Sequence, residues 1–249
     1  MSSYTTPSDP ETQLAETTVS IARRFRGPEN SGNGGYSCGL LARVFDGPVE
    51  VTLKAPPPLD TPLSLVRDEQ GARLLHGETE IAMAREAAVD VDPPPAPAMS
   101  AAEAARSRYV GPDEHAIPGC FVCGPKRAAG DGMRIFAGPD EALGVAATPW
   151  TPEPGQADAS GHVATEFLWS ALDCPGYFGL LRPGLPALLG RMAAEILEAP
   201  RPGDAWIVIG WKIDHEGRKY HAGSAVYSAD GRLLAKSRQP WIEVGGQFT

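Results

Sequence analysis

Apolar and polar residues alternate along several short stretches of the first half of the chain. The clearest is 49–55, Val-Glu-Val-Thr-Leu-Lys-Ala, in which every second side chain is apolar. This spacing is typical of a strand that is buried on one face. An apolar segment at about 35–45 predicts a helix before it. Further strands are predicted at Thr17–Phe25, near 62–68 and near 72–85, with a turn at Gly71 between the last two.

The second half repeats this order of elements. A long apolar helix is predicted at about 163–181, and the dipeptides Glu216-Gly217 and Asp230-Gly231 predict tight hairpin turns. Each half therefore gives a helix followed by an antiparallel meander. The strands of the second half are predicted near 132–137, 142–148, 187–198, 205–214, 218–228 and 232–244.

A proline-rich stretch separates the halves. The run Asp92-Pro93-Pro94-Pro95-Ala96-Pro97 predicts a stiff extended linker. Ser100 followed by Glu103 resembles a capping box and predicts a short helix after it. We expect four segments: a flexible N-terminus at 1–15, a first unit at 16–92, the linker with its helix at 93–118, and a second unit at 119–249.

Composition narrows the classes of function. The chain has 249 residues, of which 42% are hydrophobic, so it can bury a core. The 28 glycines and 25 prolines favour antiparallel sheet with many turns over a helical bundle. A net charge of −9 argues against nucleic acid as a partner. The N-terminus is polar and no apolar run is long enough to span a bilayer, so we expect a cytoplasmic protein without a membrane partner.

Three short motifs carry a resemblance to a known family. The segments 119–125, Gly-Cys-Phe-Val-Cys-Gly-Pro, and 131–135, Asp-Gly-Met-Arg-Ile, are similar to the opening of many hotdog thioesterases. Asn33-Gly34-Gly35-Tyr36 resembles the start of their central helix, and Leu172-Asp173 resembles a dipeptide late in that helix. The chain thus resembles the double-hotdog acyl-CoA thioesterase-like family. The resemblance implies an α+β fold, a tandem hotdog of two antiparallel sheets, each wrapped around a long central helix and paired to extend the sheet.

The resemblance also implies a site. The N–H groups at Gly34 and Gly35 would hold the carbonyl oxygen of an acyl thioester, with Asn33 beside them, and Asp173 would activate water or attack the carbonyl. In the family that the chain resembles, the acid comes eight residues after the first glycine of the helix start. Eight positions before Asp173 stands Thr165, and eight positions after Gly34 stands Ala42, so the first half has the glycines without the acid and the second half has the acid without the glycines. Sites of this family lie between two units, so the resemblance implies one complete site between the halves, and the opposite site, Thr165 with Ala42, is expected to be inactive.

Other residues of the two helix starts are candidates for binding substrate. They are Asn30, Tyr36, Thr165, Glu166 and His162. The expected ligand is a small-molecule acyl thioester, with coenzyme A as part of the substrate and no cofactor or metal. By analogy with hotdog proteins we also expect a homodimer.

Three alternatives remain open from the sequence. The stretch Gly35-Tyr36-Ser37-Cys38-Gly39 fits the nucleophile elbow of serine hydrolases, although a loop precedes it in place of a strand. The protein could instead bind acyl-CoA without catalysis, or be a hydratase of the same fold using His162.

The cysteines allow a separate hypothesis. Cys120 and Cys123 have the spacing of half a zinc site, but no second pair follows. His115 and Cys38 could complete the site, although nothing in the spacing supports them. A plain structural role for Cys120 and Cys123 is the preferred interpretation.

Overall fold

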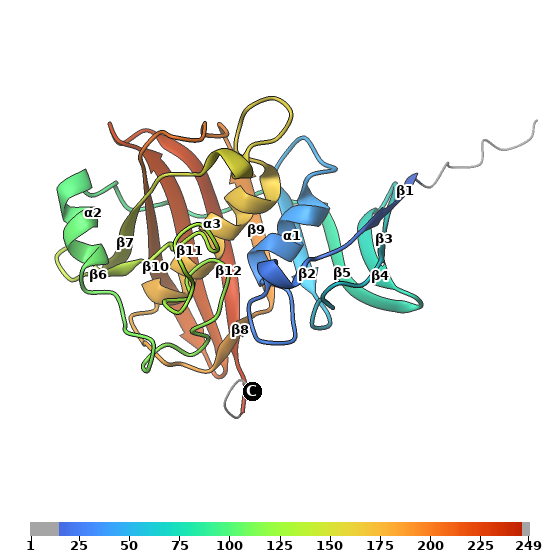
Figure 1. Ribbon diagram of the computed structural model, residues 1–249, viewed down its shortest axis with the longest axis horizontal. Helices are drawn as coiled ribbons and strands as arrows, with labels where there is room; N and C mark the ends of the chain where they lie inside the picture. The colour runs from blue at the N-terminus through green and yellow to red at the C-terminus, as the bar shows by residue number, and fades with distance from the viewer. Residues whose placement is uncertain (1–14, 246–249) are drawn as a thin grey trace, which may run out of the picture.

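The computed structural model describes residues 15–245, which form one antiparallel sheet of twelve strands with helices packed on it (Figure 1). The strand order is β1-β3-β4-β5-β2-β9-β12-β11-β10-β7-β6, and β8 pairs with β12. The strands are β1 Ala15–Val19, β2 Val49–Leu53, β3 Leu63–Asp68, β4 Gly71–His76, β5 Thr79–Glu86, β6 Gly138–Asp140, β7 Val145–Trp150, β8 Ala187–Leu189, β9 Arg191–Ile196, β10 Trp206–Glu216, β11 Lys219–Ser228 and β12 Leu233–Glu243. The α-helices are α1 Gly34–Ala42, α2 Met99–Arg106 and α3 Thr165–Gly179.

The two halves of the chain meet in the middle of the sheet. β2 of the first half pairs antiparallel with β9 of the second, with Val49 opposite Ala194 and Val51 opposite Met192. The expectation that the two units pair to extend the sheet is confirmed, and the strands form a single continuous sheet in place of two separate ones. Edge pairing satisfies backbone groups that two separate sheets would leave exposed, which is the physical reason for the union.

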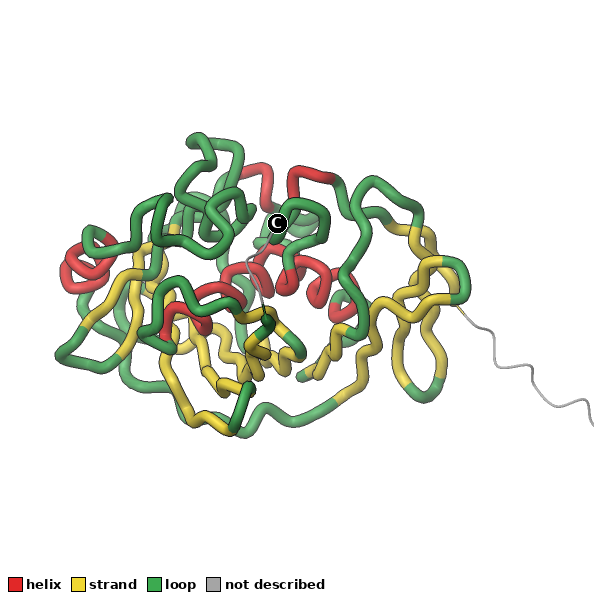
Figure 2. The backbone as a smooth tube through the Cα atoms, turned by 90° about the horizontal axis from the view of Figure 1, so that it is seen from below, coloured by secondary structure: helices red, strands yellow, loops and turns green. Residues whose placement is uncertain are grey.

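α1 and α3 lie side by side on one face of this sheet (Figures 1 and 2). Glycines allow the close approach of α3 to the sheet. A Cβ atom at Gly210 of β10 would overlap with the carbonyl of Pro175, and one at Gly176 would overlap with the side chain of Gln239. Leu168, Trp169 and Leu172 of α3 are then fully buried.

The chain enters α1 and α3 through the same backbone turn. Before α1, a 3₁₀ turn at Arg23–Phe25 is followed by a hydrogen bond from the N–H of Gly32 to the carbonyl of Pro57 at 2.9 Å. Before α3, the N–H of Val163 donates to the carbonyl of Pro200 at 2.8 Å, after a 3₁₀ turn at Pro154–Gln156. The repeated pattern read from the sequence is therefore also present in the backbone hydrogen bonds.

The linker region packs on the opposite face of the sheet. Ala102 and Ala105 of α2 are fully buried in a second apolar cluster with Val145 and Ala147 of β7, which α2 contacts. The Oη of Tyr227 donates to the carbonyl of Pro94 and fixes the proline-rich stretch. This segment thus covers a face that would otherwise leave apolar residues of the second half in water.

Several predicted boundaries differ from the structure. The first strand ends at Val19, because the chain turns into the 3₁₀ segment before α1. Residues 132–137 form no strand, and 72–85 is a hairpin that turns at Gly77, which has a φ of 56°. Ser100 and Glu103 form no capping box, since α2 has Ala98 at its N-cap without a side-chain hydrogen bond.

Candidate active site

The carboxyl group of Asp173 is the centre of the candidate site. Asp173 lies in the third turn of α3 with 2% of its surface exposed. Its Oδ2 accepts hydrogen bonds from the Nδ2 of Asn33 and from the N–H of Gly35, both at 2.9 Å. Its Oδ1 is buried and has no hydrogen-bond partner among the described residues. The structure therefore brings Asp173 of one half against the helix start of the other half and leaves one carboxyl oxygen free.

Asn33 stabilises this arrangement through both polar atoms of its side-chain amide. As the N-cap of α1, it accepts the N–H of Tyr36 at its Oδ1 at 2.9 Å. An asparagine at an N-cap satisfies one of the free N–H groups of the first helical turn. Its Nδ2 is then directed at Asp173, so the same residue that begins α1 also orients the carboxyl group of α3.

The two glycines at the start of α1 have different tasks. A Cβ atom at Gly35 would overlap with the Cβ of Asp173 and lie 2.7 Å from the carbonyl oxygen of Trp169. Gly35 is thus required for the close approach of α1 and α3, and its N–H is already bonded to Asp173. The N–H of Gly34 has no acceptor in residues 15–245. Of the two N–H groups expected to hold a carbonyl oxygen, Gly34 alone is available.

Burial raises the pKa of Asp173 to about 7. Loss of solvation is the largest cause, and the nearby Cys120 also raises the pKa. The hydrogen bonds from Gly35 and Asn33 act in the opposite direction, because they favour the charged form. A carboxyl group that titrates near neutral pH suits proton transfer under physiological conditions.

A cavity of about 460 Å³ opens on this carboxyl group. Asn33, Gly34 and Asp173 contribute its polar end, and Asn30 lies on the loop before α1 that forms part of its wall. The apolar wall comes from both halves and includes Leu53, Ile117, Tyr177, Leu188, Leu189 and Trp241. The cavity thus combines a hydrogen-bonding end with a hydrophobic wall, as small-molecule sites usually do.

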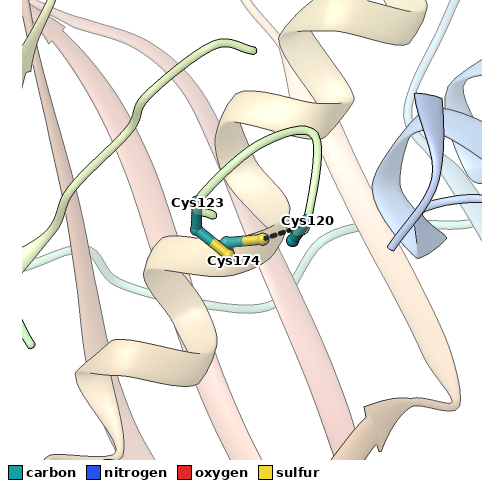
Figure 3. Close-up of side chains that lie close together, drawn as sticks. All are labelled: Cys120, Cys123 and Cys174. Atoms are coloured by element: carbon teal, nitrogen blue, oxygen red, sulfur yellow. Dashed lines mark hydrogen bonds between the residues drawn. The ribbon is translucent and has the colours of Figure 1, made fainter. Parts of the chain in front are cut away.

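Three cysteines border the same cavity, and their side chains lie close together (Figure 3). Cys120 and Cys123 lie on the loop that crosses over α3, and Cys174 lies on α3 next to Asp173. Their sulfur atoms lie within 4.8 Å of one another, and Cys120 and Cys174 are separated by 3.9 Å. Sequence reasoning missed Cys174 because its spacing from the Cys-x-x-Cys pair carries no signal, and a contact between loop and helix depends on the fold.

Neither of the two residues first considered as partners of the cysteine pair joins this cluster. Cys38 is buried on α1 and does not belong to the sulfur group. His115 borders the cavity, but its Nδ1 accepts the N–H of Ile117 and its Nε2 is bonded to the Oη of Tyr109, both at 2.9 Å. Burial lowers the pKa of His115, so a neutral ring held at both nitrogens faces the cysteines.

The remaining predicted binding residues lie away from the cavity. Tyr36 is buried in an aromatic cluster and stacks on Phe25 with 4.2 Å between ring centroids. Thr165 borders a different, smaller cavity. His162 is bonded to the Oγ of Ser160 at 2.9 Å, and neither it nor Glu166 lines the cavity at Asp173.

The elbow motif around Ser37 does not form a nucleophile elbow. Ser37 lies within α1, which follows a loop, and its Oγ donates to the carbonyl of Asn33 at 2.8 Å. The side chain is fully buried, and no histidine is bonded to it in residues 15–245. The described contacts therefore give Ser37 a hydrogen bond back to the carbonyl four residues earlier and no activating base.

The start of α3 lacks the features found at the start of α1. Its N-cap is Ala164, which makes no side-chain hydrogen bond. The cavity beside it measures about 110 Å³ and is bordered by Thr165 and Ala42, the counterparts of Gly34 and Asp173. The structure thus contains two related helix starts, of which one faces a buried carboxyl group.

No helix within residues 15–245 has both the length and the apolar character that crossing a lipid bilayer requires.

Neither a protein-family model nor a curated protein sequence matches the chain. Solved structures do match it over nearly its whole length. A proposed thioesterase from Novosphingobium aromaticivorans has a TM-score of 0.62 at 12% identity, over 93% of this chain and 96% of that one. A hot dog fold protein of unknown function from Alicyclobacillus acidocaldarius has a TM-score of 0.59 at 16% identity, over 94% and 97%. The TesB protein of Mycobacterium avium subsp. paratuberculosis has a TM-score of 0.56 at 11% identity, over 92% and 93%. The chain therefore has the hotdog fold of these thioesterase-like structures.

Proposed function

We propose that this protein is a double-hotdog thioesterase that hydrolyses acyl thioesters, with acyl-CoA as the substrate class, at a single asymmetric site between its two halves. The observation that carries the proposal is the buried carboxyl group of Asp173. Two donors from the start of α1 fix its Oδ2, its buried Oδ1 has no hydrogen-bond partner among the described residues, and Asp173 borders a cavity with an apolar wall. The thioesterase names of structures with the same fold support this class of reaction.

The site provides a donor for the carbonyl oxygen of the thioester. The N–H of Gly34 belongs to the first turn of α1, where the helix dipole is positive, and Gly34 borders the cavity. An N–H in this position stabilises the negative charge that develops on the oxygen as the carbonyl is attacked. Such a donor lowers a barrier by roughly 3 kcal/mol.

Asp173 supplies the base. In its ionised form, Oδ1 takes a proton from water, and the resulting hydroxide adds to the carbonyl carbon. The carbon–sulfur bond then breaks, and the proton held by Asp173 passes to the leaving thiolate, which restores the carboxylate. Direct attack of Oδ1 on the carbonyl, which would form an anhydride that water then hydrolyses, uses the same geometry. Both routes draw on residues of this chain alone.

The apolar wall of the cavity suits the acyl part of the substrate. Leu53 and Leu189 come from the two strands beside the junction of the halves, and Trp241 comes from β12. Each buried methylene of an acyl chain would gain about 0.8 kcal/mol from leaving water. We expect turnover to increase with acyl length until the cavity of about 460 Å³ is filled.

The test is a panel of acyl-CoA thioesters of increasing chain length, with free coenzyme A measured by chromatography. We expect turnover of the purified protein on part of this panel. If no ester is hydrolysed but calorimetry shows that the same esters bind, the protein is a non-catalytic acyl-CoA binding protein and the proposed enzyme activity is contradicted.

A further inference from the structure

We propose that Cys120, Cys123 and Cys174 form a metal site for a soft d¹⁰ cation, with Zn²⁺ as its expected occupant, directly beside the candidate active site. The proposal does not depend on thioester hydrolysis. It rests on the convergence of three buried sulfur atoms from two separate segments of the chain (Figure 3).

The sulfur atoms have nearly the spacing that zinc requires. Tetrahedral zinc with Zn–S bonds of about 2.3 Å places its sulfur ligands about 3.8 Å apart. Cys120 and Cys174 are 3.9 Å apart, and all three sulfurs lie within 4.8 Å of one another. Adjustments of less than about 1 Å would bring all three to bonding distance. A disulfide would need about 2.05 Å and would leave the third cysteine unused.

The loop that carries Cys120 and Cys123 is folded as a tight turn. The N–H of Gly124 donates to the carbonyl of Cys120 at 2.9 Å. A Cβ atom at Gly124 would lie 2.6 Å from both the N of Cys120 and the carbonyl oxygen of Pro118, so only glycine fits. The turn directs both sulfurs toward α3, where Cys174 completes the group.

Hydrogen-bond donors surround the sulfur of Cys120. The Nδ2 of Asn33 lies 3.8 Å from this sulfur and 4.0 Å from that of Cys174. An amide donor beside a sulfur favours the thiolate, which is the form that binds metal.

Among residues 15–245, no lysine or arginine forms an ion pair with Asp173 or a hydrogen bond with the three cysteine sulfurs, so no such cation balances a thiolate there. The neighbouring His115 is held by Ile117 and Tyr109 and carries a lowered pKa. A bound divalent cation would supply the missing charge, and each thiol would release its proton to solvent as its metal–sulfur bond forms, without oxidation.

The fourth coordination position would open on the cavity. All three cysteines border the cavity, and His115 cannot enter the coordination sphere without losing one of its two hydrogen bonds. Three protein ligands with one exchangeable position is the arrangement of zinc sites that stay open to a water or a ligand. A metal here would also tie the Cys120 loop to α3 beside Asp173.

The test uses the full-length protein with Co²⁺ as a spectroscopic probe for Zn²⁺. The protein is purified and depleted of metal with a mercurial that releases thiolate-bound ions by binding the cysteines. Excess thiol then removes the mercurial, the thiol is removed in turn, and the protein is titrated with Co²⁺ in the absence of oxygen. We expect about one ion per chain, an intense sulfur-to-cobalt charge-transfer band in the near ultraviolet, and loss of that band when Zn²⁺ is added. Elemental analysis of the protein as purified should find zinc in the same ratio.

Variants assign the band to the three cysteines. Cys120→Ser, Cys123→Ser and Cys174→Ser should each reduce the charge-transfer band by a third or more and weaken Zn²⁺ binding at least about tenfold. Cys38→Ser is the matched control, a buried cysteine outside the cluster, and should keep the full band. Wild-type protein that gives no charge-transfer band with Co²⁺ and holds no metal as purified would overturn the proposal, and so would an equal loss of the band in Cys38→Ser.

Discussion

The two central helices begin with the same backbone turn and with different side chains. α1 begins with Asn33-Gly34-Gly35 and faces the carboxyl group of Asp173. α3 begins with Ala164-Thr165, has no side-chain cap, and shares its cavity with Ala42. The start of α1 borders a cavity of about 460 Å³, and the start of α3 borders a cavity of about 110 Å³. The fold thus supplies two equivalent positions for a site, and a few side chains determine which of them can carry chemistry.

Asp173→Asn is the change with the largest expected effect on this comparison. The asparagine keeps an oxygen for the donors Asn33 and Gly35 but cannot act as a base. Loss of a general base lowers turnover by about 100-fold to 10,000-fold. The measurement is kcat on the best acyl-CoA of the panel. Asp46→Asn, at the smaller cavity, is the matched control and should keep kcat within about twofold. Retained activity in Asp173→Asn would contradict the assignment of Asp173 as the base.

The same variant should also change how stability depends on pH. Burial raises the pKa of Asp173 from 3.8 to about 7, so the folded state keeps a proton that the unfolded state loses. Wild-type stability therefore falls between about pH 4 and pH 7 relative to the variant, and the difference is constant above that range. A shift of about three pKa units corresponds to roughly 4 kcal/mol. Denaturant unfolding at pH 5 and pH 8 should capture roughly 2.6 kcal/mol of it, because only the interval from pH 5 to about pH 7 is sampled, and an equal effect of Asp173→Asn at both values would contradict the raised pKa.

Gly35→Ala tests whether the close contact between α1 and α3 is needed for the site. The added methyl group would overlap with Asp173 and crowd the carbonyl oxygen of Trp169. Overpacking of this kind costs about 1–3 kcal/mol, and separation of the helices would also break the hydrogen bond to Oδ2. We expect lower unfolding free energy together with lower kcat. Gly47→Ala, where a Cβ atom would meet nothing within 4 Å, should change neither value.

The smallest expected effects come from two single variants, one that removes the N-cap of α1 and one that adds an N-cap to α3. Asn33→Ala removes a cap and should cost about 1 kcal/mol of stability, whereas Ala164→Asn adds a cap to α3 and should gain a similar amount. Asn33→Ala alone should lower kcat, because it also frees the carboxyl group of Asp173. Thermal unfolding and kcat of both variants provide the measurement. A loss of kcat in Ala164→Asn would mean that the start of α3 takes part in the reaction.

Much of this architecture could be predicted from the sequence because it depends on local patterns. Alternation located β2, the apolar run located α3, and Glu216-Gly217 located the turn between β10 and β11. The resemblance to hotdog thioesterases, in which the acid follows the helix start by eight residues, implied that Asp173 faces the start of α1, as it does. What local patterns could not provide was the direction of individual groups, such as the N–H of Gly35, which donates to Asp173 and is therefore unavailable to a substrate.

Contacts between distant segments were the other limit. Cys174 joins Cys120 and Cys123 only through the crossing of a loop over α3, and nothing in its sequence spacing indicates this. Tyr36 was expected near substrate, yet it packs against Phe25 and Phe121, because an aromatic ring in an apolar helix serves core packing equally well. The sequence can thus indicate which helix carries binding residues, but not which face of that helix points toward the substrate.

The most direct measurement of the central claim is a crystal structure with a non-hydrolysable acyl-CoA analogue in which a methylene group replaces the sulfur. The account predicts that the carbonyl oxygen of the analogue accepts the N–H of Gly34 and that its carbonyl carbon faces the Oδ1 of Asp173. An analogue bound beside Thr165 and Ala42, or bound in the larger cavity with its carbonyl turned away from Asp173, would contradict it.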